Sequence, residues 1–199
     1  MQIDSRLPVA ALTREMTELH SFYERAYELP DESGVAKLLG RVLGLGITYI
    51  DTAPAYGLSE ERLGRALVDH PSRPVISTKV GETYQDGVSR YEFSPEATRA
   101  SVDRSARRLG RDVLDMVFVH SDGNDLAIQE SSGVVETLLS LKAEGRVRAV
   151  GFSGKTVAGA RRSLEWADVV MIGRPVCIAA FGAAQEGVEF YLDQKRSEL

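Results

Sequence analysis

Polar side chains that could take part in proton transfer follow short apolar runs at several places in the chain. Asp51 follows "ITYI", and Tyr56 comes five residues later in the segment "TAPAYG". Lys79 follows "VIST", and His120 follows "MVFV". Carboxyl, phenol, ammonium and imidazole groups are those that general acid–base catalysis uses. These four residues therefore indicate a candidate catalytic site, provided that the fold brings them together.

The four residue types are compatible with proton donation by a tyrosine. A tyrosine hydroxyl is ordinarily a poor acid near neutral pH, because its unperturbed pKa is about 10. A nearby cation favours the phenolate, so Lys79 held beside Tyr56 would make that hydroxyl a better proton donor. Asp51 would pair with the lysine and keep it charged. His120 could then orient a substrate.

Taken one at a time, the same residues also have structural interpretations. Asp51 could cap a loop, Lys79 could be a solvated strand end, and Tyr56 could pack against a helix. His120 alone is equally compatible with a structural or a functional role. The functional hypothesis therefore depends on all four residues occurring together in one fold.

Helical and strand patterns alternate from about residue 31, and this alternation decides the fold class. Apolar residues at helical spacing predict helices over residues 35–43, 59–67, 95–110, 134–144 and 156–166. Short apolar runs predict strands over residues 47–50, 74–80, 114–120, 147–152 and 168–172. Ser59 and Ser94 are predicted helix N-caps, and Pro95 suits a first helical turn. Strands that are joined by helical crossovers run parallel, so the sequence predicts an α/β fold.

Two parallel α/β architectures fit these repeated units, a barrel and an open doubly wound sheet. No GxGxxG motif follows the first strand, which weakens the doubly wound interpretation. Asp51, Lys79, His120 and Ser153 each stand at the end of a predicted strand, and in a barrel these ends converge on the mouth that carries the active site. We therefore expect the (β/α)8 TIM-barrel type. A complete barrel takes eight strands and about 250 residues, so 199 residues predict an incomplete one with about five or six βα units.

Four segments resemble aldo-keto reductases in their order and spacing. They read "GITYIDTAPAYGLSEERLG", "VISTKVGE", "LDMVFVHSDG" and "VRAVGFSGKT". The resemblance implies a barrel enzyme that reduces an aldehyde or ketone to an alcohol with NADPH or NADH, without a metal. It implies catalytic roles for Asp51, Tyr56, Lys79 and His120, with Tyr56 as the proton donor. Asp51 and Ser153 would also contact the cofactor, although Gly154 stands where an asparagine often follows that serine.

The resemblance covers residues 29–172, and the segments on either side differ from the family pattern. Residues 1–28 do not show the usual first strand, and residues 173–199 do not show the last βα units that hold the cofactor phosphates. We therefore expect a truncated member of the family with divergent ends. The alternative is a catalytically impaired barrel that acts as a binding or assembly module. Unpaired strand edges would favour association as a homodimer.

Composition excludes several other classes of function. The formal net charge of -5 and the pI of about 5.3 give no basic surface for nucleic acid. No apolar run approaches the roughly 18 residues that predict a membrane span, and no signal peptide is evident. Cys177 is the single cysteine, so no disulfide framework or cysteine metal site is expected. These features predict a cytoplasmic protein, and the resemblance implies that its partner is a small-molecule carbonyl substrate.

A nucleotide-hydrolysing enzyme is the competing hypothesis for one segment. "AVGFSGKT", residues 149–156, lies between a predicted strand and a predicted helix, as a Walker phosphate-binding loop would. Its first position is Ala149, however, where that motif requires glycine. We therefore expect Lys155 and Thr156 to form the first turn of a helix, with their polar side chains in solvent.

Overall fold

The structure is a computed structural model that describes residues 31–85 and 87–172. Its elements follow one another along the chain as α2 (Glu32–Gly44), β1 (Tyr49–Asp51), α3 (Ser59–Leu67), β2 (Val75–Val80), β3 (Glu82–Gln85), β4 (Val88–Tyr91), α4 (Pro95–Leu109), β5 (Leu114–His120), α5 (Asp125–Ser131), α6 (Val134–Ala143), β6 (Val147–Gly154), α7 (Val157–Ser163) and β7 (Val169–Ile172). The predicted alternation of strand and helix is confirmed. The expectations for residues 1–28 and 173–199, including Cys177, lie outside the described residues.

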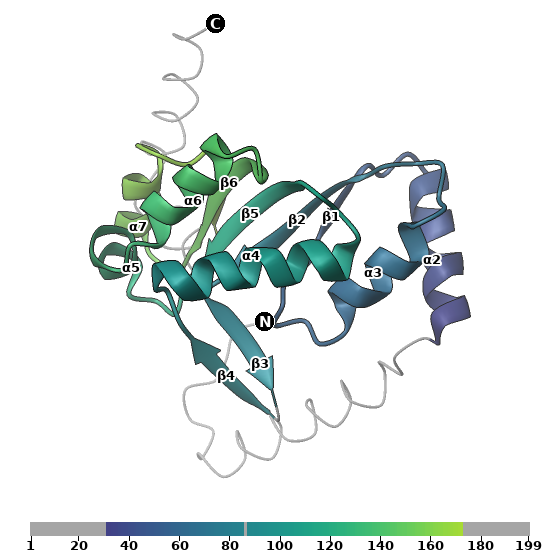
Figure 1. The fold of residues 1–199 in the computed structure, drawn as a ribbon, viewed down its shortest axis with the longest axis horizontal. Coiled ribbons are helices and arrows are strands. Elements are labelled where there is room, and N and C mark those ends of the chain that lie inside the picture. Colours follow the sequence, from purple (N-terminus) through teal and green to yellow (C-terminus); the bar gives the residue numbers. More distant parts are fainter. Residues whose placement is uncertain (1–30, 86, 173–199) are drawn as a thin grey trace, which may run out of the picture.

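A parallel sheet organises the described part of the chain. Its five strands lie in the order β1-β2-β5-β6-β7, and every neighbouring pair runs parallel. The sheet is curled, as in an incomplete (β/α)8 barrel, and the predicted fold class is confirmed (Figure 1). Within the described residues it does not close, because β1 pairs only with β2 and β7 only with β6.

The hydrophobic core lies between this sheet and the helices that cover one of its faces. Alternate strand residues point toward the helices, and Ile76 of β2, Val117 of β5 and Phe152 of β6 are all buried there. Val102 of α4 and Leu138 of α6 belong to the same cluster. Figure 1 shows α4 lying across the sheet. The helix-covered face supplies the packing, which leaves the other face of the sheet for the strand residues in between.

The ends of α4 follow the sequence prediction. Ser94 is the N-cap and its Oγ accepts a hydrogen bond from the Ala97 N–H at 3.3 Å, with Pro95 in the first turn. The helix ends at Gly110, whose φ of 62° lies in the left-handed region that glycine adopts without steric cost. Cap chemistry therefore sets both ends of this helix.

Two other helix ends differ from the prediction. Ser59 does not cap α3, because the N-cap is Leu58 and the Ser59 Oγ accepts a hydrogen bond from Thr52 Oγ1 at 2.8 Å. Helix α7 ends at Ser163 and does not continue to Trp166. Over the next residues the backbone N–H groups bond carbonyl oxygens three residues back, a tighter turn than that of an α-helix.

The β3–β4 hairpin and the short helix α5 were not among the predicted elements. Strands β3 and β4 pair antiparallel, and the hairpin follows directly from the end of β2. Figure 1 shows it projecting from that end of the sheet. A signal for it exists in the sequence, since Asp86 and Gly87 form the dipeptide typical of tight hairpin turns. Within residues 31–85 and 87–172, no helix is both long enough and apolar enough to span a membrane.

Candidate active site

The strand ends bring the predicted site residues to one face of the sheet. Asp51 lies opposite Ser77, which is two residues before Lys79 on β2. His120 at the end of β5 lies opposite Ser153 of β6. Because side chains two residues apart point to the same side of a strand, these residues share the face opposite the helical core. Parallel strands also put their carboxyl ends at the same edge, so the groups converge there.

Lys79 is a charged side chain in a buried position. It is 1% exposed, and a buried ammonium group needs compensating partners. The Lys79 Nζ donates to Asp51 Oδ2 at 2.7 Å and to the Thr52 carbonyl oxygen at 2.9 Å. It also lies 4.7 Å from the centre of the Tyr56 ring, within the range of cation–π attraction. The structure thus places this lysine between the aspartate and the tyrosine, and not in solvent.

Asp51 is held by a second hydrogen bond from its own sheet. Ser77 Oγ donates to Asp51 Oδ1 at 2.5 Å, and the Tyr49 hydroxyl donates to Ser77 Oγ at 2.8 Å. The two carboxylate oxygens therefore have different partners, one neutral and one cationic. This arrangement fixes the carboxylate in the orientation that pairs with Lys79.

Tyr56 stands on the loop between β1 and α3, at the rim of the site. Its side chain is 47% exposed, and its ring meets that of His120 edge-on with 6.5 Å between the centroids. An apolar hollow of about 440 Å³ adjoins it, lined by residues of α2, α3 and this loop, among them Leu38 and Leu58. Tyr56 is therefore accessible to a ligand while it contacts both Lys79 and His120.

His120 lies beside a carboxylate that the sequence analysis did not single out. Its Nδ1 is 2.7 Å from Glu82 Oε2 of the β3–β4 hairpin, although the angles of this contact fall outside hydrogen-bond geometry. Burial lowers the pKa of His120, the charges of Lys79 and Lys155 act in the same direction, and Glu82 opposes them. The imidazole is therefore mostly neutral at neutral pH, with a carboxylate at one of its two nitrogens.

The segment after β6 is organised by a buried aspartate. Asp125 Oδ2 accepts hydrogen bonds from the backbone N–H groups of Lys155 at 2.9 Å and Thr156 at 2.7 Å, and from Thr156 Oγ1 at 2.7 Å. The Thr156 side chain also caps α7. The expectation that this threonine points into solvent is therefore wrong. Since the carboxylate occupies both N–H groups, they do not form the phosphate cradle of a Walker loop.

The same aspartate explains why position 154 is a glycine. A Cβ at this position would lie 2.7 Å from the Phe152 ring and 3.0 Å from Asp125 Oδ2. The asparagine that often stands here in the resembled family would not fit without movement of both neighbours. Ser153, one residue earlier, is half-buried on the sheet face that carries His120.

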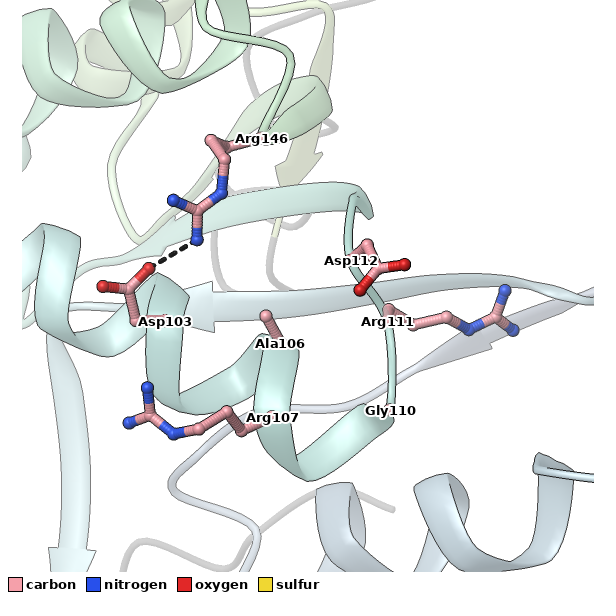
Figure 2. Close-up of a pocket in the computed structure, with 7 residues that line it drawn as sticks. All are labelled: Asp103, Ala106, Arg107, Gly110, Arg111, Asp112 and Arg146. Atoms are coloured by element: carbon pink, nitrogen blue, oxygen red, sulfur yellow. Dashed lines mark hydrogen bonds and ion pairs between the residues drawn. The ribbon is translucent and has the colours of Figure 1, made fainter.

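A second hollow, of about 520 Å³, lies far from these groups (Figure 2). It is lined by Asp103, Ala106, Arg107, Gly110, Arg111, Asp112 and Arg146. Arg111 and Arg146 precede β5 and β6, so the hollow is at the amino ends of the strands, opposite the candidate site. Arg146 pairs with Asp103 at 2.6 Å, and Figure 2 shows Arg111 extending away from that pair. Within the described part of the chain, no three His, Cys, Asp or Glu residues gather as metal ligands.

Comparison with known proteins decides the family. The sequence profile of the aldo/keto reductase family matches residues 23–187, most of the chain. The chain belongs to this family. The fold and the four motifs agree with this membership, and the family's activities are oxidation and reduction.

Individual known proteins match this chain over part of their length. L-galactose dehydrogenase of Arabidopsis thaliana is 37% identical over 115 residues, 55% of this chain and 35% of that protein. D-threo-aldose 1-dehydrogenase of a Pseudomonas species is 31% identical over 153 residues, 64% of this chain and 46% of that protein. A solved structure from Pseudomonas aeruginosa, assigned to the aldo-keto reductases, has a TM-score of 0.71 at 49% identity, covering 76% of this chain and 63% of that one. The chain thus spans about half the length or less of these curated relatives.

Proposed function

We propose that this protein is an NAD(P)H-dependent oxidoreductase that interconverts a carbonyl compound and an alcohol, with Tyr56 as the proton donor in reduction. The observation that carries the proposal is the position of Lys79. Its ammonium group lies 2.7 Å from Asp51 and 4.7 Å from the centre of the Tyr56 ring, in a buried setting. A positive charge beside this ring would stabilise the negative charge that develops as Tyr56 gives up its proton.

The described residues fit the nicotinamide end of the cofactor. Asp51 and Ser153 present polar groups on the sheet face that carries Lys79 and His120. NADPH or NADH would supply the hydride that reduces the carbonyl carbon. Asp51 and Ser153 would hold and orient that end of the cofactor. Residues 173–199, where the family's phosphate-binding units would begin, lie outside the described residues.

The protein's own groups would manage the proton. In the reductive direction, the Tyr56 hydroxyl gives its proton to the substrate oxygen as the carbonyl carbon gains a hydride. Lys79 stabilises the resulting phenolate, and Asp51 balances the lysine charge in the buried site. His120 contacts the substrate oxygen and orients it. In the oxidative direction, the Tyr56 phenolate takes the proton of the alcohol.

The substrate class that we propose is a polyhydroxylated aldehyde or its hemiacetal, as in an aldose sugar. This rests on the two curated relatives, whose names describe an L-galactose dehydrogenase and an aldose 1-dehydrogenase. Half-buried and exposed polar side chains near the site, such as Ser153 and Tyr91, are of the type that hydrogen-bonds sugar hydroxyls.

Tyr56→Phe tests the proposed function. The variant keeps the ring that meets Lys79 and His120 but has no proton to donate, so turnover should fall at least a hundredfold, within the range for general acid catalysis. The assay follows the absorbance of the reduced cofactor with an activated aromatic aldehyde and with aldoses. Tyr84→Phe is the matched control, because Tyr84 is 51% exposed on the hairpin.

The two hypotheses for this chain give different results in that assay. An unchanged rate in Tyr56→Phe would show that another group is the acid. A folded wild-type chain with no turnover on any aldehyde or sugar would favour the alternative, a binding or assembly module that keeps the catalytic residues without the activity.

We also propose that the chain associates as a homodimer. The proposal rests on the single-sided pairing of β1 and β7 in the described sheet, and the comparisons add no support for it. Strand edges of this kind tend to pair with other chains.

A further inference from the structure

The β3–β4 hairpin carries an acid–imidazole contact that the proposed reaction has not used. Glu82 is the first residue of the hairpin, directly after the strand that ends with Lys79 and Val80. Its side chain is 11% exposed and that of His120 is 20% exposed, with 2.7 Å between Glu82 Oε2 and His120 Nδ1. The contact joins residues that are far apart in the sequence, so the fold has to create it.

The second oxygen of the same carboxylate is anchored by the opposite strand of the hairpin. Ser89 Oγ donates to Glu82 Oε1 at 2.6 Å, and the Tyr91 hydroxyl donates to the same atom at 3.0 Å. Burial by itself would raise the pKa of Glu82, but these hydrogen bonds and the nearby His120 and Lys155 outweigh it and lower the pKa. The group is therefore a carboxylate at neutral pH, and its free oxygen is directed at the imidazole.

We propose that Glu82 is a positioning residue for His120: its carboxylate keeps the proton of the neutral imidazole on Nδ1, so that Nε2 presents a lone pair to a hydroxyl group of the substrate. The angles of this contact fall outside hydrogen-bond geometry, but the carboxylate lies 2.7 Å from Nδ1 and has no proton to donate, so its negative charge favours the proton on that nitrogen. The other nitrogen of a neutral imidazole is then an acceptor.

This arrangement favours one direction of the proposed reaction, on which the inference rests. An alcohol or hemiacetal hydroxyl can donate to Nε2, whereas a carbonyl oxygen needs a donor and is served only when His120 becomes doubly protonated. At neutral pH, Glu82 therefore adapts the site to bind the alcohol form and to oxidise it. In acid the imidazolium form would serve reduction.

The tautomer can be read directly in the full 199-residue chain without any substrate. Long-range ¹H–¹⁵N correlation spectra distinguish Nδ1–H from Nε2–H imidazoles, and at about pH 8 histidines are mostly neutral. His70 is an internal reference, because its Nδ1 accepts a hydrogen bond from the Ser72 N–H at 3.1 Å and it must carry its proton on Nε2. His120 should show the opposite tautomer. Its signals are assigned by their loss in His120→Asn.

Glu82→Gln and Glu136→Gln form the variant pair. Both remove one negative charge, but Glu136 is exposed on α6, on the helical side of the sheet. Glu82→Gln should move His120 toward the Nε2–H tautomer, and Glu136→Gln should not. A wild-type His120 that carries its proton on Nε2, or an unchanged tautomer in folded Glu82→Gln, would overturn the proposal. The wild-type spectrum alone decides the point if that variant does not fold.

Kinetics separate this inference from the proposed function. In Glu82→Gln, kcat for alcohol oxidation should fall about two- to tenfold, the size of effect that loss of one polar contact has, while kcat for reduction falls less. A general structural loss would lower both rates equally and would contradict a positioning role.

The pH dependence of oxidation gives a second readout. The acidic limb of the kcat profile should move to lower pH in Glu82→Gln, because Asp51, Lys79 and Lys155 still face His120 and only the Glu82 charge that favoured its protonation is gone. If the wild type shows the expected tautomer but no turnover, the proposed function fails and the positioning of His120 stands.

Discussion

Ser77 shows how a neutral side chain can decide the geometry of a charged pair. Its hydroxyl donates to Asp51 Oδ1 at 2.5 Å, while the other oxygen of that carboxylate pairs with Lys79. Without the serine, Asp51 can turn about its side-chain bonds and weaken its contact with the lysine. Asp51 is the more exposed partner, with 30% of its side chain accessible, so solvent competes for it.

Ser77→Ala should therefore lower both stability and kcat. Loss of one hydrogen bond in a partly buried site costs about 1 kcal/mol of unfolding free energy, which urea unfolding would measure. Ser140→Ala is the control, since Ser140 Oγ also donates to a carboxylate, Glu144 Oε1 at 2.8 Å, but on the outer helical layer. The role of Ser77 in the site would be supported if both variants lose similar stability and only Ser77→Ala loses turnover. Unchanged kcat in Ser77→Ala would contradict it.

At the scale of elements, the packing of α3 against α4 depends on a residue without a side chain. A Cβ at Gly64 would lie 2.1 Å from the backbone carbonyl oxygen of Arg108. The contact is reinforced by Glu60, which is fully buried and accepts hydrogen bonds from Thr78 Oγ1 at 2.6 Å and from Arg108 at 3.2 Å. Arg108 is therefore part of a helix–helix contact.

Gly64→Ala should destabilise the fold by about 1 to 3 kcal/mol, because the clash is with backbone and the helices must separate. Gly40→Ala in α2 is the matched control. No atom lies within 4 Å of a Cβ at Gly40, and alanine is the better helix former by about 1 kcal/mol. Thermal unfolding should thus move in opposite directions in the two variants. A Gly64→Ala protein as stable as the wild type would show that α3 and α4 can separate without cost.

Local sequence patterns predicted some parts of the candidate site and missed others. Asp51, Lys79 and His120 were predicted at strand ends, because apolar runs reveal strands and parallel strands place their ends together. Glu82 was missed, because its importance comes from a contact with His120 across 38 positions of sequence. Thr156 was placed wrongly for a similar reason. A distant buried carboxylate, Asp125, binds it, and no local pattern announces that partner.

The whole described sheet has one face covered by helices and another that carries the site. On the site face, Tyr49, Val75 and Val169 are 42%, 43% and 37% exposed, and the outer strands β1 and β7 each have a neighbour on one side only. Exposed apolar surface costs roughly 25 cal/mol per Å² relative to burial. A domain stable by about 5 to 15 kcal/mol gains appreciably if such a face is covered.

This argument predicts that the purified 199-residue chain is a homodimer, which light scattering after size-exclusion chromatography would measure over a range of concentrations. Val169→Lys should shift it toward the monomer, because a charged side chain on an edge strand opposes pairing with a second chain. Val157→Lys on α7 is the control, since that side chain is similarly exposed, at 39%, but lies in the helical layer. A wild-type chain that stays monomeric at every concentration, unfolds cooperatively and binds no apolar dye would contradict the prediction. In that case contacts within one chain must already protect the site face.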